Sequence, residues 1–109
     1  MSQADRSRWN KRYGEGAYQE RTKASAIVQD WVSKPLKNSL ALDLASGSGR
    51  NAFYLSQLGY VVSAVDISNV ALDRARRNTK NHKNKIEWFE HDLESGLPPV
   101  LENIEFDLI

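Results

Sequence analysis

The sequence of 109 residues predicts one α/β domain built on an open, doubly wound parallel sheet. Short apolar runs alternate with segments of helical periodicity, which is the pattern of strand–helix–strand units. A glycine-rich turn follows the first apolar run, and an aspartate follows each of the next two. Because parallel strands joined by crossover helices end at the same edge of a sheet, these features predict a ligand site there.

Composition excludes several kinds of site. Hydrophobic residues make up 40% of the chain, charged residues 27%, and the net charge is +1. The absence of cysteine excludes disulfides and thiolate metal sites. No apolar run approaches the roughly 20 residues of a membrane span, and the N-terminus lacks a signal-peptide core. We therefore expect a cytoplasmic protein with no metal site, no membrane association and no nucleic-acid partner.

The N-terminal third is predicted to be largely helical. Trp9 and Tyr13 are four residues apart, which would place both rings on one helix face. An amphipathic helix is expected from about Glu20 to Ser33, ended by Pro35. Its apolar positions recur at helical spacing: Ala24, Ile27, Val28, Trp31 and Val32. We assign residues 1–18 to an N-terminal arm or lid and residues 19–109 to the domain built on the sheet.

The rest of the chain alternates between strand and helix. Gly59 is placed to end one helix and Ser68 to cap the next. Lys80–Lys85 is expected to be a loop and Gly96–Pro99 a turn. The predicted strands cover residues 40–45, 61–65, 86–90 and 105–109, and the predicted helices cover residues 51–58 and the segment after Ser68.

A basic run from Arg74 to Lys85 has two interpretations. It could form a phosphate-binding patch, or it could be a solvated helix face with the loop that follows. No aromatic residues alternate with these charges, as a site for single-stranded nucleic acid would require. The second interpretation is therefore favoured.

The turn after the first strand carries the strongest functional signal. Gly47 and Gly49 lack Cβ atoms, so the backbone can turn sharply and approach a ligand closely. Asp66 ends the second strand 19 residues after Gly47, where its carboxylate can accept hydrogen bonds from a ribose diol. Asp92 follows the third strand at the same edge, where it could bind an adenine amino group or be an exposed loop acid. The set indicates a nucleotide-type ligand.

Two cofactors fit this pattern. Residues Gly47–Ala52 satisfy the Gly-x-Gly-x-x-Gly/Ala spacing of dinucleotide sites. However, Asp43 lies just ahead of the turn, where its charge would repel a diphosphate and attract an ammonium or sulfonium group. S-adenosylmethionine carries both cations and no phosphate, so it is the favoured cofactor. A dinucleotide-dependent oxidoreductase and a non-catalytic nucleotide-binding or dimerising module remain as alternatives.

Neither of the two histidines is assigned a functional role. His82 and His91 have no partners at metal-ligand spacing, so both are interpreted as surface or packing residues. No Ser–His–Asp or paired-carboxylate arrangement is present in the pattern, so no catalytic residue is assigned.

Several segments resemble motifs of the class I S-adenosylmethionine-dependent methyltransferases. Trp9–Tyr13 is similar to an element that precedes the core in the tellurite-resistance and thiopurine methyltransferase-like branch. Ala45 departs from the pattern, because the family often has glycine there. Motif I is matched by Leu42–Asn51, and the acidic motif of the second strand by Val65–Ser68. The adenine-contacting motif is matched by His91–Leu93, and the start of the fourth strand by Phe106–Ile109.

The resemblance implies a Rossmann-like fold that is incomplete in this chain. Strands one to three and the start of the fourth are present from a seven-stranded core. We expect the chain to be the N-terminal part of a longer methyltransferase. The open edge at the fourth strand could pair with a second copy.

The resemblance also implies an activity and residue roles. The activity is methyl transfer from S-adenosylmethionine to a small-molecule acceptor, with this chain carrying the cofactor-binding half. Asp43 would help hold the amino group, and Asp66 would bind the ribose hydroxyls. The other implied roles are the methionine part for Gly47 and Gly49, the adenine for Ile67, Asp92 and Leu93, and a lid for Trp9 and Tyr13.

Overall fold

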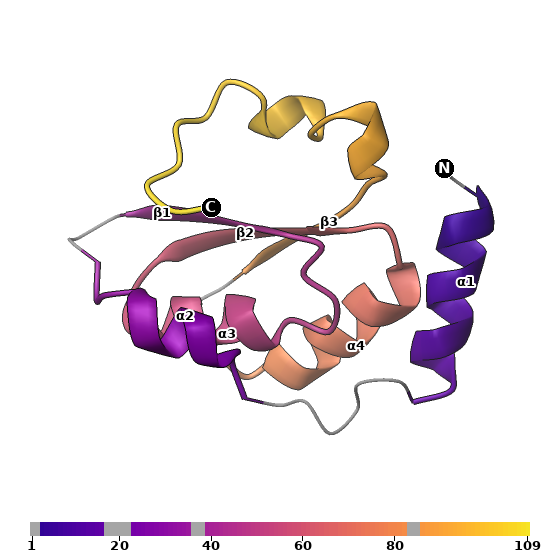
Figure 1. The fold of residues 1–109 in the computed structure, drawn as a ribbon, viewed down its shortest axis with the longest axis horizontal. Helices are drawn as coiled ribbons and strands as arrows, with labels where there is room; N and C mark the ends of the chain where they lie inside the picture. Colours follow the sequence, from indigo (N-terminus) through magenta and orange to yellow (C-terminus); the bar gives the residue numbers. More distant parts are fainter. Residues whose placement is uncertain (1–2, 17–22, 36–38, 83–85) are drawn as a thin grey trace.

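A computed structural model describes residues 3–16, 23–35, 39–82 and 86–109 as a parallel sheet with helices (Figure 1). The sheet order is β1-β2-β3, with β1 (Leu40–Leu44), β2 (Val61–Asp66) and β3 (Glu87–Glu90). The helices are α1 (Gln3–Gly14), α2 (Ala26–Trp31), α3 (Arg50–Leu58) and α4 (Asn69–Thr79), followed by the 3-10 turns η1 (Leu93–Ser95) and η2 (Pro99–Leu101). The predicted parallel α/β class is confirmed. No helix in these ranges is long and apolar enough to cross a membrane.

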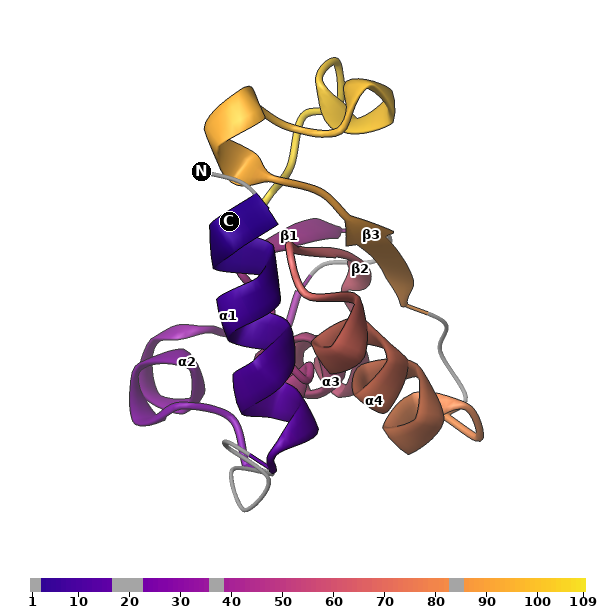
Figure 2. The ribbon, with the colours of Figure 1, turned by 90° about the vertical axis from the view of Figure 1, so that its right-hand side faces the viewer.

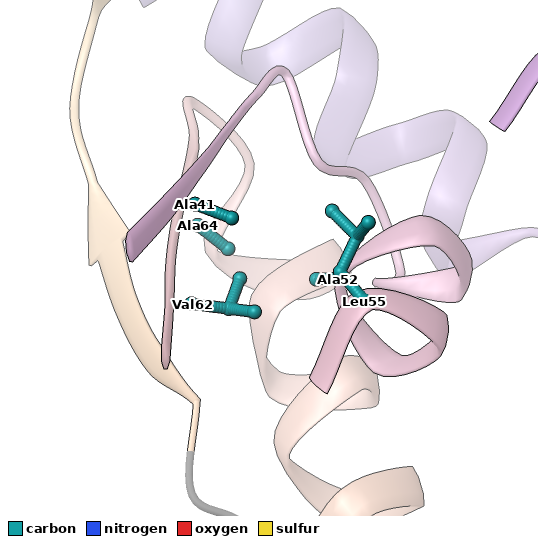
Figure 3. Packing of buried hydrophobic residues seen from close by; sticks show 5 residues of the cluster. All are labelled: Ala41, Ala52, Leu55, Val62 and Ala64. Atoms are coloured by element: carbon teal, nitrogen blue, oxygen red, sulfur yellow. The ribbon is translucent and has the colours of Figure 1, made fainter. Parts of the chain in front are cut away.

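Alternate residues of the strands build a separate core on each face of the sheet. On the helix side, alanines from β1 and β2 let α3 pack close to the strands, as Figure 3 shows. Five buried residues form this core: Ala41, Ala52, Leu55, Val62 and Ala64. On the other face, Leu42 and Val65 pack with Leu101 of η2. The segment after β3 therefore covers the face of the sheet opposite α2, α3 and α4 (Figure 1).

The boundaries of α3 and α4 follow the prediction closely. Gly59 ends α3 with a left-handed φ of 119°, and its N–H donates to the Leu55 carbonyl at 3.2 Å. Ser68 caps α4, because its hydroxyl accepts the Ala71 N–H at 3.1 Å. The expected loop after α4 is described only to His82, since residues 83–85 lie outside the described ranges.

α2 is shorter than the helix predicted from residue 20 to residue 33. Ser25 caps its N-terminus and Val32 is already extended, while residues 20–22 lie outside the described part of the chain. The predicted apolar face is buried only in part. Val28 and Val32 pack against the helix-side core, whereas Ile27 and Trp31 are 74% and 82% exposed.

The predicted strand at residues 105–109 is wrong in extent. Only one parallel bridge forms, between Leu108 and Ala41 of β1. The Asp107 carboxylate accepts the Leu40 N–H at 2.7 Å, so a side chain takes the first donor of β1 and limits the ladder. The segment still lies beside β1, on the side away from β2. Pairing of this edge with a second copy stays a prediction.

α1 lies against α4 at the carboxyl ends of the strands (Figures 1 and 2). Its anchoring bonds are polar. Arg6 donates to the Ile67 carbonyl at 3.0 Å, and Asn10 accepts the Ser68 hydroxyl at 2.6 Å. Tyr13 is the one residue of α1 that is buried. The expected division into an arm of residues 1–18 and a domain of residues 19–109 stays a prediction.

Ala45, the residue after β1, adopts a left-handed backbone conformation with a φ of 54°. A Cβ atom makes this conformation unfavourable by roughly 1–2 kcal/mol, and glycine avoids that cost but loses more chain entropy on folding. We expect Ala45→Gly to raise the free energy of unfolding by up to about 1 kcal/mol, measured by urea denaturation. The same change in a helix, Ala4→Gly in α1, should lower it by up to about 1 kcal/mol. A destabilised Ala45→Gly variant would contradict the prediction.

Candidate cofactor-binding site

The glycine turn between β1 and α3 is tied to the end of β2 by Asp66. This buried carboxylate accepts the Gly47 N–H through Oδ2 at 2.8 Å and the Ser68 N–H through Oδ1 at 2.8 Å. The Ser46 N–H also donates to the Val65 carbonyl at 2.9 Å. Each Asp66 oxygen has a further lone pair, so the residue can bind a ligand hydroxyl while it holds the turn.

The two glycines of the turn have different neighbours. A Cβ atom on Gly47 would lie 2.5 Å from the Tyr13 hydroxyl, so α1 approaches the turn directly at this residue. A Cβ atom on Gly49 would lie 2.6 Å from the Trp88 ring and 3.2 Å from the Cβ of Ala75. Gly49 is therefore required for packing among α3, α4 and β3.

Two adjoining pockets open at the carboxyl edge of the sheet, and they share Trp9, Tyr13 and Ala45. The turn pocket, of about 260 Å³, is lined in addition by Asp43, Leu44, Ser46, Gly47, Ser48, Arg50 and Asn51. The strand-end pocket, of about 230 Å³, is lined in addition by Asp5, Asp66, Ile67, His91, Asp92 and Leu93. The structure thus brings every predicted site residue to these pockets except Gly49, which lines neither.

Asp43 is a half-buried acid in the turn pocket, with a buried Oδ2 atom. Its Oδ2 atom has no hydrogen-bond partner. Burial, and then the charge of Asp66, raise the pKa of Asp43 from 3.8 to about 6, although a hydrogen bond with the Ala52 backbone and the charge of Arg50 act to lower it. A positively charged ligand group would favour the ionised form and supply the missing partner. The site therefore fits an ammonium group.

Two more pocket residues carry unpaired polar atoms, and sequence reasoning missed both. In the described ranges, the buried side-chain nitrogen and oxygen atoms without a hydrogen-bond partner are Asp43 Oδ2, Ser46 Oγ and His91 Nε2. An unpaired buried polar atom costs about 1–3 kcal/mol, so three of them beside two pockets indicate a ligand that pairs with them. Their positions in the sequence could have marked both as candidates, because Ser46 lies in the glycine turn and His91 directly precedes Asp92.

Asp92 and the apolar residues complete the strand-end pocket. Asp92 Oδ1 accepts the Glu94 N–H at 3.0 Å and caps η1, which fixes the carboxylate at the end of β3. Ile67 and Leu93 give this pocket apolar wall, and it is the more apolar of the two. No group of three or more metal-ligating side chains occurs among the residues that the structure describes.

Tyr13 and Trp9 project from α1 over both pockets. Their ring centroids are 6.1 Å apart. Arg74 of α4 donates to the Tyr13 carbonyl, and its guanidinium lies 5.6 Å from the centroid of the Tyr13 ring. These contacts hold Tyr13 in place, and Trp9 lies against its ring, while the role of the two residues as a lid stays a prediction.

An open parallel sheet with a glycine turn and strand-end aspartates around a pair of pockets defines a Rossmann-like domain that binds a nucleotide-type cofactor. The particular family follows from comparison with known proteins. A family model described as "Methyltransferase domain" matches residues 41–109, and the chain belongs to this family.

The chain is similar to three further proteins. An uncharacterised RNA methyltransferase of Protochlamydia amoebophila is 33% identical over 69 residues, which are 62% of this chain and 16% of that protein. The crystal structure of TehB from Haemophilus influenzae aligns with a TM-score of 0.57 and 28% identity, over 74% of this chain and 29% of that one.

The third is magnesium protoporphyrin IX methyltransferase from Synechocystis PCC 6803, solved with bound SAH (S-adenosylhomocysteine). It aligns with a TM-score of 0.68 over 87% of this chain and 52% of that one, and at 18% identity it shows the fold alone. The chain therefore spans between 16% and 52% of the length of these three proteins.

The raised pKa of Asp43 predicts how stability depends on pH. The folded state binds the Asp43 proton more tightly than the unfolded chain does. Protonation of Asp43 therefore stabilises the fold fully below pH 3.8, and this stabilisation is lost as pH rises through about 6. Asp43→Asn should remove this dependence and stabilise the ligand-free chain at pH 7 by about 2–3 kcal/mol, measured by urea denaturation across this range. Asp73→Asn, at an exposed carboxylate of α4, is the matched control. Equal pH profiles for wild type and Asp43→Asn would contradict the assignment.

Proposed function

We propose that this chain binds S-adenosylmethionine and forms the cofactor-binding half of a methyltransferase that acts on a small molecule. The observation that carries the proposal is the buried Asp43 oxygen that has no partner beside the glycine turn. This carboxylate oxygen would attract a cationic ligand group and repel a diphosphate. Membership of the methyltransferase domain family supports the same class of cofactor.

The two pockets suit the two ends of this cofactor. The turn pocket is the more polar and would take the methionine part, with Asp43 on the ammonium group and Gly47 beside the chain. The strand-end pocket would take the adenosine part. There Asp66 keeps lone pairs for the ribose hydroxyls, Asp92 would accept from the adenine amino group, and Ile67 and Leu93 would contact the ring.

Methyl transfer from S-adenosylmethionine would need little acid or base catalysis from this chain. Bound S-adenosylmethionine supplies a methyl group that is already activated by the sulfonium. The residues described here bind and orient it, and Trp9 and Tyr13 cover both pockets and limit the access of water. No residue of the chain is assigned a proton-transfer role.

The small-molecule acceptor and the tellurite-resistance-like branch are the finer parts of the proposal. The 28% identity to TehB supports that branch. The RNA methyltransferase relative makes RNA the competing acceptor. Against RNA, two arginines of the basic run have partners inside the chain, since Arg74 binds Tyr13 and Arg76 pairs with Asp73 at 3.1 Å. Lys83 and Lys85 lie outside the described residues. The cytoplasmic location stays a prediction.

Titration calorimetry tests the cofactor. We expect S-adenosylhomocysteine to bind the chain and NADH to leave it unoccupied, because only the first places an ammonium group beside Asp43. Asp43→Asn should weaken S-adenosylhomocysteine binding about tenfold, the loss of one charge-assisted hydrogen bond. The same variant is expected to be more stable than wild type, so reduced folding cannot explain the weaker binding.

Asp73→Asn provides the matched control and should bind S-adenosylhomocysteine like wild type. Binding of NADH alone would reverse the choice of cofactor. Unchanged affinity in Asp43→Asn would remove this residue from the site. Acceptor class is then tested on the complete protein, by methyl transfer from labelled cofactor to pooled small molecules and to RNA.

A further inference from the structure

We propose that His91 recognises the base of the cofactor, through a hydrogen bond between its Nε2 atom and the edge of the adenine ring. This inference rests on the proposed function. It adds a specificity residue to the strand-end pocket, since the sequence analysis gave roles to Asp92 and Leu93 of the adenine-contacting motif but none to His91. The evidence lies in the burial of the Nε2 atom of His91, in the chemistry of its neighbours and in a contrast with His82.

The His91 imidazole is fixed at the sheet edge with one nitrogen unpaired. Its backbone N–H donates to the Asp66 carbonyl at 2.9 Å, which continues the pairing of β2 and β3 by one residue. Its Nε2 atom is buried and has no hydrogen-bond partner. Because such an atom is costly to leave unpaired, a ligand in the pocket that His91 lines would stabilise it.

The other residues of the strand-end pocket show what kind of ligand group His91 would meet. Trp9, Ile67 and Leu93 offer apolar surface to a flat ring. The carboxylates of Asp66 and Asp92 can only accept hydrogen bonds when ionised. Adenine presents ring nitrogens that need a donor as well as an amino group that needs an acceptor. The Nε2 atom of His91 supplies that donor when it carries a proton.

His82 shows what a histidine with a purely structural role looks like in this chain. Its Nε2 atom lies 3.1 Å from the buried Ser56 hydroxyl, and its ring centroid lies 4.4 Å from that of Phe53. His82 therefore already has a hydrogen-bond partner and a ring contact. Because the chain contains only two histidines, His82 also serves as an internal reference for His91.

Nuclear magnetic resonance of the 15N-labelled histidines in the 109-residue chain tests the inference directly. On titration with S-adenosylhomocysteine, the Nε2 resonance of His91 should shift and that of His82 should stay in place. His91→Phe keeps a ring but removes the nitrogens, and we expect it to weaken binding of S-adenosylhomocysteine roughly fivefold. His91→Gln, which returns a polar group near the Nε2 position, should recover most of that loss.

His82→Gln is the matched control and should bind S-adenosylhomocysteine like wild type. If the ligand binds wild type while the His91 resonance and the affinity of His91→Phe are unchanged, the inference about His91 is overturned and the proposed function stands. If wild type does not bind S-adenosylhomocysteine at all, both are overturned.

Discussion

The site depends on the carboxylate of Asp66, which bonds two backbone N–H groups from different segments. One belongs to Gly47 in the turn after β1, and the other belongs to Ser68 in the loop that starts α4. Main-chain pairing alone fixes β1 beside β2, but it does not fix how the chain turns after each strand. Asp66 does so with one buried group. It lines the strand-end pocket, holds Gly47 of the turn pocket in place, and fixes the start of the helix that packs against α1.

The same carboxylate contributes to an unfavourable concentration of negative charge in the site. Asp66 is the second cause, after burial, of the raised pKa of Asp43. Two acids close together in a buried edge are unfavourable when both are ionised and nothing positive lies between them. A ligand with an ammonium group relieves this repulsion, whereas a phosphate increases it. The arrangement thus costs stability in the ligand-free chain, and under the proposed function it would favour a cofactor with a cationic group over a dinucleotide.

Local rules explain which parts of the fold could be predicted from the sequence. Gly59 and Ser68 act on their own helices, and the aspartates share an edge because parallel strands end together. The features that could not be predicted depend on contacts between residues that are distant in sequence. The packing of Gly49 against Trp88 and the pairing of Asp107 with Leu40 give no local signal. The buried Nε2 atom of His91 is equally invisible, since a histidine after a strand reads as a surface residue.

The position of α1 follows from the loop that Asp66 organises. Arg6 bonds the Ile67 carbonyl and Asn10 bonds the Ser68 hydroxyl, so the helix is held by the residues directly after Asp66. α1 buries little apolar surface, with Tyr13 as its one buried residue, so these polar bonds account for much of its placement. A ligand that contacts Asp66 and Ile67 therefore touches the segment that anchors α1. The placement of Trp9 and Tyr13 beside the pockets therefore depends on the geometry at the end of β2.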